Sequence, residues 1–246
     1  MSKYNRLETT SASLHWIAMV CMLCDHLWAT IIPGNDWLTC IGRAAFPIFA
    51  FLLAEGFRHT RNLGNYVKRL LFAALLSEIP FDLMVSGSVF DPFHQNVLWT
   101  FLLAIGVLRI NEQCREKAFW KRAAVAAATA VLGALAGLLT FSDYLHVGVL
   151  TVLVFYFFRG RSWYCFAGQA LCLYFLNFEA LGGLEYVFSL KGMTIVIPQQ
   201  GFALLALIPI WLYQGRRGYH SRAMSWLNYL FYPVHMLLLY LLSLIL

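Results

Sequence analysis

Charged side chains are scarce in this sequence. Only 12% of its 246 residues are Asp, Glu, Lys or Arg, whereas 61% are hydrophobic and the mean hydropathy is +0.67. A soluble domain usually contains about 25% charged residues. The hydrophobic residues also form blocks that a surface in contact with water could not accommodate, which excludes an ordinary soluble domain.

Common nucleotide-binding, hydrolase and zinc motifs are absent as well. The sequence contains no P-loop, Rossmann fingerprint, Gly-x-Ser-x-Gly or His-Glu-x-x-His. Cys21 and Cys24 form a Cys-x-x-Cys, but no second pair completes a zinc site, so we predict no bound metal. The polar residues 1–13 precede a long apolar run without a small-x-small site, which is not typical of a cleavable signal peptide.

Nine apolar blocks follow one another along the chain. Several approach the roughly 20 residues that a helix needs to cross hydrocarbon, and a backbone in lipid must form its hydrogen bonds internally, which favours helices. No internal repeat or long linker divides the chain, so residues 1–246 are predicted to form one all-α integral membrane domain. The predicted helices cover residues 13–32, 44–57, 70–85, 96–108, 123–141, 147–158, 163–178, 195–213 and 226–246.

The basic residues lie almost entirely in alternate gaps between these blocks. Of the 18 Lys and Arg residues, 16 fall on one side of the predicted bundle, and only Arg43 and Lys191 fall on the other. The positive-inside rule assigns the basic side to the cytoplasm. We therefore predict about nine transmembrane helices, with the N-terminus inside and the C-terminus outside. This placement suits anionic lipid at the inner membrane face and argues against nucleic acid as a partner.

Polar residues gather near the outer ends of the predicted helices, where an ionisable group is costly and is a functional candidate. Asp25 and His26 lie in the first helix, Arg43 opens the second, and Glu78 and Asp82 share one face of the third. We expect Asp25, His26, Arg43 and Glu78 to meet in a cavity open toward the outer leaflet. Packing and purely structural ion pairs are the alternative explanation. The group also includes Asn96, Thr100, Asp143, Tyr144, His146, Gln199, Gln200 and His235.

A second, basic group lies on the inner side. Its candidate anion-binding residues come from the end of the second helix, the start of the third and the loop before the last. Basic side chains next to glycine amides can hold phosphates. The alternative is the ordinary positive-inside bias together with anionic lipid headgroups. The residues concerned are Arg58, His59, Arg69, Arg216 and Arg217.

Taken in order, these segments resemble the TraX family of membrane acetyltransferases. This family is named after a protein that acetylates the N-terminus of conjugative pilin, and it is distantly similar to the membrane acyltransferase-3 proteins. The similarity covers nearly the whole chain. Gln214 replaces an expected Asn, and Leu145-His146-Val147 interrupts an expected Asp-Tyr-Gly. The matching stretches are IAMVCMLCDHLW (17–28), IGRAAFPIFAFLLAEGFRHTRNLGNYVKRLLFAALLSEIPFDL (41–83), QNVLWTFLLAIG (95–106), DYLHVGVL (143–150), YQGRRGYH (213–220) and LFYPVHMLLLY (230–240).

The resemblance implies an acyltransferase, specifically an acetyltransferase, of a bacterial cytoplasmic membrane. Its acyl donor would be a cytosolic acyl-CoA such as acetyl-CoA, which acts as a substrate and not as a permanently bound cofactor. The acceptor would lie outside the cytoplasm and would be a peptide amine or an envelope glycan. The alternative is a transporter with a buried His, Asp and Arg site, although the paired broken helices of many transporters are not visible here.

The same resemblance suggests roles for the polar residues. Acyl transfer needs a base and a group that stabilises an oxyanion. His26 is the candidate base because imidazole titrates near neutral pH, and Asp25 either orients His26 or pairs with Arg43. Arg43 and Asn96 are candidate oxyanion or acceptor-binding groups. Glu78 completes the predicted catalytic set, the basic group would bind the CoA phosphates, and the candidate acceptor-binding residues are Asp82, Asp143, Tyr144 and His235.

Overall fold

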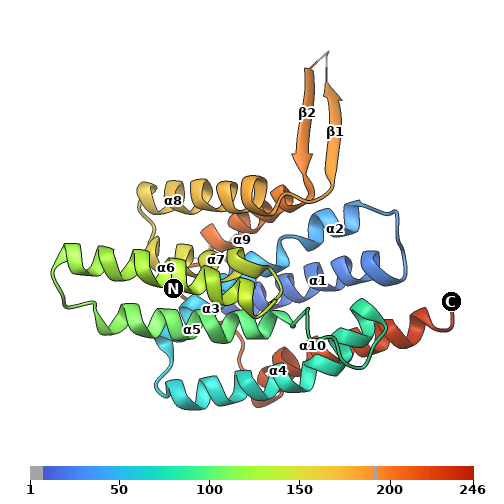
Figure 1. Cartoon of the computed structure of the whole chain (residues 1–246), viewed down its shortest axis with the longest axis horizontal. Helices are drawn as coiled ribbons and strands as arrows, with labels where there is room; N and C mark the ends of the chain where they lie inside the picture. The colour runs from blue at the N-terminus through green and yellow to red at the C-terminus, as the bar shows by residue number, and fades with distance from the viewer. Residues whose placement is uncertain (1–7, 191–192) are drawn as a thin grey trace, which may run out of the picture.

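The computed structural model describes residues 8–190 and 193–246, and helices dominate it (Figure 1). Lys3, Arg6 and Lys191, which entered the count of basic residues, lie outside the described residues. The elements are α1 (Ser11–Thr30), α2 (Trp37–Gly42), α3 (Ala45–His59), α4 (Leu63–Ser86), α5 (Val97–Gln113), α6 (Phe119–Leu139), α7 (Leu145–Phe157), α8 (Trp163–Tyr174), the π-helix η1 (Phe175–Leu181), β1 (Glu185–Leu190), β2 (Met193–Pro198), the 3-10 helix η2 (Gln199–Ala206), α9 (Leu207–Trp211) and α10 (Arg222–Ser243).

Each of the nine predicted blocks contains a helix. Two residues separate α2 from α3, and the pair is continuous enough to act as one span, Trp37–His59; η2 and α9 likewise form one apolar stretch, Gln199–Trp211. In the described part of the chain, four helical stretches are long and apolar enough to cross a membrane, so this is a membrane protein. They are Ser11–Thr30, Trp37–His59, Phe119–Leu139 and Ala223–Ser243.

The all-α prediction is wrong for one segment, because β1 and β2 form an antiparallel hairpin from Glu185↔Pro198 to Leu190↔Met193. The predicted helix 195–213 therefore begins in a strand, and its helical part starts only at Gln199. β-Branched and aromatic residues such as Val187, Phe188 and Ile195 favour strands, although an apolar run this short reads equally well as a helix. The hairpin projects away from the bundle, across the direction of the long helices, toward the top of Figure 1.

Polar side chains determine where several helices begin. Thr10 and Ser13 form a capping box at the start of α1, and Asn62, Asn96 and Ser221 accept hydrogen bonds from the first free backbone N–H groups of α4, α5 and α10. Such caps satisfy donors that have no partner within the helix. Asn96, a predicted catalytic residue, thus has a structural task at the beginning of α5.

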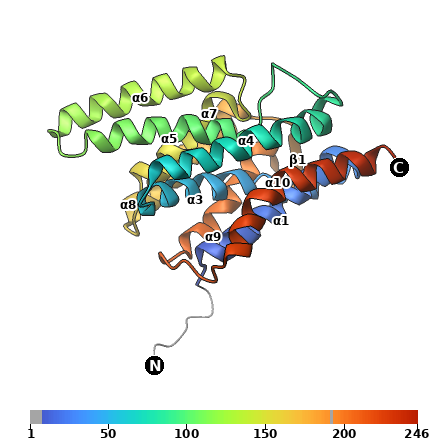
Figure 2. The ribbon, with the colours of Figure 1, turned by 90° about the horizontal axis from the view of Figure 1, so that it is seen from below.

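The helix α3 lies at the centre of the bundle and is surrounded by α1, α5 and α7 (Figure 2). Small residues allow the neighbouring helices to approach closely. A Cβ atom at Gly137 of α6 would lie 2.2 Å from the Leu145 carbonyl oxygen, and one at Gly148 of α7 would lie 2.4 Å from Thr100 Cγ2. Close approach at glycine is a usual way to pack helices in a membrane, where lipid removes the hydrophobic driving force.

The loops gather at two ends of the bundle (Figure 1). We call one the basic end; it comprises loops 60–62, 114–118, 158–162 and 212–221 and carries Arg61, Arg115, Arg161 and Arg217. We call the other the acidic end; it comprises loops 31–36, 87–96 and 140–144 and carries Asp36, Asp91 and Asp143. The C-terminus lies at the acidic end (Figures 1 and 2). The loops of the basic end carry most of their charge as arginine and lysine, although Glu116 also lies there.

Candidate functional site

Arg43, at the junction of α2 and α3, forms an ion pair with Asp25 of α1. The Thr39 hydroxyl donates to the other oxygen of Asp25 at 2.7 Å, and Gln199 Nε2 donates to Thr39 Oγ1 at 2.9 Å. A Cβ atom at Gly42 would lie 2.4 Å from Asp25 Cβ, so this glycine allows α1 and α2 to approach. Of the two alternatives for Asp25, the structure has the pair with Arg43: one carboxylate oxygen accepts from Arg43 and the other accepts from Thr39.

His26 instead contacts His235, which the sequence placed among the acceptor-binding residues. His26 Nδ1 lies 2.7 Å from His235 Nε2, and His235 Nδ1 lies 2.6 Å from the Phe231 carbonyl oxygen. His235 is only 6% exposed. Electrostatic interactions also connect His26 to Asp25 and Arg43. Residues of α1, α10 and the α2–α3 junction thus meet at one position, and we call His26 and His235 the histidine pair.

Glu78 is held by α5 and not by Arg43. Its Oε2 accepts a hydrogen bond from Trp99 Nε1 at 2.8 Å and another from the Asn96 side-chain amide. The same amide nitrogen donates to the Ala74 carbonyl at 3.0 Å, and Asn96 Oδ1 accepts from Leu98 N at 3.0 Å. Asn96 therefore has no free N–H for an oxyanion, contrary to its predicted role. The expected group of four divides into Asp25, Arg43 and His26 on one side and Glu78 on the other.

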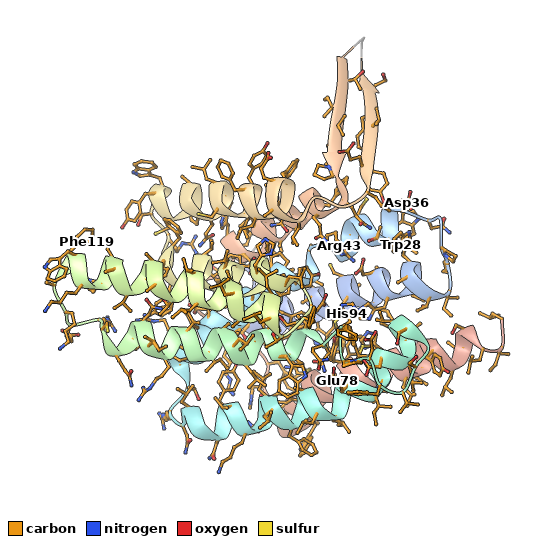
Figure 3. The ribbon with its side chains drawn as sticks, in the orientation of Figure 1. Trp28, Asp36, Arg43, Glu78, His94 and Phe119 are labelled. Atoms are coloured by element: carbon orange, nitrogen blue, oxygen red, sulfur yellow. The ribbon has the colours of Figure 1, made fainter. Side chains whose placement is uncertain are left out.

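The acidic end is closed by two loops that bond to each other. Gln95 N donates to the Phe141 carbonyl and Asp143 N donates to the Gln95 carbonyl, both at 2.9 Å. His94 Nε2 lies 3.8 Å from Asp143 Oδ1, and this carboxylate raises the pKa of His94 above its ordinary value. Figure 3 shows His94, Glu78 and Arg43 in the same half of the molecule as Asp36, whereas Phe119 marks the basic end.

The other predicted acceptor-binding residues also have structural contacts at the acidic end. Asp82 is buried and its Oδ2 accepts from the backbone N–H of Asp91 at 2.9 Å. Tyr144 has a left-handed backbone with φ of 63° and stacks on Phe46, with ring centroids 3.8 Å apart. Asp143 Oδ1 accepts from the Tyr144 N–H at 3.1 Å. In the structure these contacts hold the loops of the acidic end in place.

A cavity of about 720 Å³ opens at the basic end. Its walls come from α1, α3, α4, α5 and α10 and from the loop before α10. Arg217 and His220 of the loop before α10 line it, and Met22, Val97 and Tyr232 line the part farthest from the basic loops. Met22 is four residues from His26, and Phe231, which also lines the cavity, is four residues from His235. The cavity thus ends one helical turn, about 6 Å of helix rise, from the histidine pair.

Three of the five predicted phosphate-binding residues line this cavity: His59, Arg69 and Arg217. Arg58 and Arg216 do not line it. Arg58 lies 3.9 Å from Glu112 Oε2, and Arg216 lies 3.1 Å from Glu8 Oε2. Within the described residues, no three His, Cys, Asp or Glu side chains are placed to hold a metal ion.

Sequence reasoning missed several polar residues in the cavity wall, among them His15 and Asn228. His15 Nδ1 lies 2.8 Å from the Ser11 carbonyl oxygen, and Asn228 Oδ1 is buried without a partner among the described residues. Helical spacing could have identified His15, because residues 15, 19, 22 and 26 are separated by four, three and four positions and share one face of α1. That face joins the cavity to the histidine pair.

Comparison with known proteins identifies the family to which this sequence is related. The family model described as "TraX protein" matches residues 10–243. The chain is 26% identical to the "Probable fimbrial assembly protein FimC, serogroup H1" of Dichelobacter nodosus over 95% of both chains. It is 27% identical to "Protein TraX" of Escherichia coli over 57% of this chain and 52% of that protein. No solved structure matches. With a match over almost its whole length, the chain belongs to the TraX protein family.

Proposed function

We propose that this protein is a membrane-embedded acyltransferase that moves an acetyl group from acetyl-CoA to an acceptor outside the cytoplasm. One observation carries the proposal: a cavity begins among basic side chains and ends one helical turn from the histidine pair, beside Arg43. A polyanionic donor and a basic catalyst are thereby brought together along one route through the bundle.

The basic end suits the donor. Arg69, Arg217 and His59 line the opening and would attract the CoA phosphates. Deeper in the cavity, Met19, Met22 and Phe101 offer an apolar wall to the arm that carries the thioester. Ser11 and Met22, at opposite ends of the cavity wall on α1, are 11 residues apart in sequence, or about 16 Å along a helix. The extended arm of CoA is of comparable length.

The acidic end suits the chemistry. In the proposed reaction the acceptor attacks the thioester carbonyl, its proton passes to His26, and a tetrahedral oxyanion forms. Arg43 Nε is buried without a partner among the described residues and would stabilise that oxyanion. The C–S bond then breaks, and the proton passes from His26 to the departing thiolate to give CoA thiol. Asp25 keeps Arg43 in place through their ion pair.

The topology is part of the proposal. We propose nine membrane-spanning segments in a bacterial cytoplasmic membrane, with the basic end in the cytoplasm and the C-terminus outside. Single cysteines at Lys117, in a loop of the basic end, and at Asp91, in a loop of the acidic end, test it in a background without the native cysteines. Lys117 should label from the cytoplasmic face and Asp91 from the outer face. Labelling of both from one face would refute the topology.

The acceptor we favour is a peptide amine. One relative carries the name of a fimbrial assembly protein, which suits a protein acceptor at the cell surface better than an envelope glycan. The test is purified protein in nanodiscs with radiolabelled acetyl-CoA and matched peptide and glycan acceptors. Transfer to a peptide amine supports the proposal. Substrate flux in liposomes without any turnover of acetyl-CoA would replace it with the transporter alternative.

A further inference from the structure

We infer that His235 is a positioning residue that fixes the proton on Nδ1 of His26 and leaves Nε2 of His26 as the basic nitrogen. The inference rests on the proposed acyl transfer for its catalytic meaning, but the proton position itself follows from the hydrogen bonds between α1 and α10.

The Phe231 carbonyl oxygen can only accept a hydrogen bond, and this determines the proton positions on both histidines. His235 Nδ1 lies 2.6 Å from it and must carry the proton. A neutral imidazole has one N–H, so His235 Nε2 is an acceptor. This acceptor lies 2.7 Å from His26 Nδ1, which must therefore donate. The only arrangement of two neutral rings that satisfies both contacts leaves His26 Nε2 unprotonated.

The orientation of the rings supports a true hydrogen bond. Their planes are within 3° of each other and their centroids are 4.9 Å apart. Because the two nitrogens are only 2.7 Å apart, the rings cannot be stacked in separate layers; they meet edge to edge, with the N–H and the lone pair in nearly one plane. The Phe231 ring packs nearly parallel to the His235 ring, with their centroids 4.6 Å apart, and limits rotation of the His235 ring.

The consequence for catalysis is specific. When His26 Nε2 accepts the acceptor's proton, the Nδ1–H bond to His235 becomes charge-assisted and therefore stronger. His235 thus favours the correct tautomer before the reaction and stabilises the imidazolium during it. The charged groups in electrostatic contact with His26 are Asp25 and Arg43, which form an ion pair with each other. The neutral His235 therefore remains as the hydrogen-bond acceptor for His26 Nδ1–H.

The first experiment measures the tautomer directly. Full-length protein with ¹⁵N-labelled histidine, reconstituted in lipid, is compared by solid-state NMR with His26→Gln, which identifies the His26 signals. We expect a proton on Nδ1 and none on Nε2 of His26 in the wild type, and the more common Nε2–H tautomer in His235→Leu. A proton on Nε2 of His26 in the neutral wild-type pair would overturn the inference, whether or not the protein transfers acyl groups.

The second experiment measures acyl transfer with acetyl-CoA and a peptide amine in nanodiscs. His235→Leu should lower kcat roughly 10²-fold, at the lower end of what a general base contributes, while the KM for acetyl-CoA stays the same. His235→Gln, whose amide oxygen can accept from His26, should recover part of the loss. Val234→Leu, at an exposed position next in sequence, is the control and should match the wild type. Equal kcat for His235→Leu, His235→Gln and the wild type contradicts the positioning role.

Discussion

At the acidic end, Asp25 contacts Arg43 and Thr39, and Thr39 contacts Gln199, so that neighbouring side chains hold this group of residues in place. At the basic end, His59, Arg69 and Arg217 line an open cavity of about 720 Å³. Groups fixed by the protein act without reorganisation when charge develops, whereas groups around a cavity can exchange one ligand for another. Under the proposed function, this difference suits the first set to catalysis and the second set to binding the acyl donor.

Removal of the imidazole at His26 tests this division most strongly. We expect His26→Ala to lower kcat by roughly 10²-fold to 10⁴-fold, the range for loss of a general base, while acetyl-CoA still binds at the basic end. Single-turnover kinetics and calorimetric titration with acetyl-CoA measure the two effects. Val20→Ala, an exposed position on the same helix, is the matched control. A loss of binding that parallels the loss of turnover would contradict the separation of the two ends.

The next largest effect concerns stability at the Asp25–Arg43 pair, whose side chains are each 15% exposed. Arg43→Met leaves the Asp25 carboxylate without its cation and should destabilise the fold by about 3–5 kcal/mol, as for other broken buried pairs. Arg43→Met combined with Asp25→Leu should recover much of this loss. Unfolding in mixed detergent micelles gives the coupling free energy of the double-mutant cycle. Additive losses would show that the two side chains are not coupled.

At the basic end the expected effect is smaller. Arg69→Ala combined with Arg217→Ala should weaken acetyl-CoA binding about 10-fold, or about 1.4 kcal/mol, and more strongly at low salt because exposed charges are screened. Lys121→Ala with Arg122→Ala removes the same charge from residues of α6 that do not line the cavity. If this second pair weakens binding equally, the general positive charge of the face is responsible and not the cavity.

The smallest predicted effect is the pH dependence of the loop that carries His94. Asp143 raises the pKa of His94 in the folded protein, and Asp82 and Asp91 act in the same direction. The resulting stabilisation is complete below the unfolded value of about 6.5 and is lost as the pH rises through the folded value. Because the pair is exposed to water, we expect no more than about 1 kcal/mol. Wild type should therefore lose slightly more thermal stability than His94→Gln between pH 6 and pH 8.

The sequence was sufficient to locate the helices, because a long apolar block in lipid must form its backbone hydrogen bonds internally and therefore folds as a helix. It could not reveal the hairpin, since Ile195-Val196-Ile197 is too short a run for its period to separate strand from helix. Pro198, which lacks a backbone N–H and interrupts a helix, was the available signal.

The candidate site was predictable only in its membership. His26 and His235 are 209 residues apart, so no local spacing joins them. Asp25 had two neighbours of suitable chemistry, and the choice of Arg43 depends on the close approach of α1 and α2 at Gly42. Asn96 was recognised as polar and membrane-embedded, but its use as a helix cap becomes visible only when the start of α5 is known. By contrast, the face of α1 that carries residues 15, 19, 22 and 26 is predictable from helical spacing alone.

The hairpin limits how deeply the whole bundle can sit in a bilayer. Val187, Phe188, Ile195 and Val196 are exposed on its two faces, while a two-stranded sheet leaves the outward-facing backbone groups of both strands unpaired, at several kcal/mol each in hydrocarbon. It is therefore stable only at the boundary between acyl chains and water. Gln199 follows β2 directly and donates to Thr39, so the same boundary sets the depth of Arg43. Bilayer thickness therefore affects the site, because a membrane thicker than the bundle must thin locally around a protein that is held at the boundary at one end.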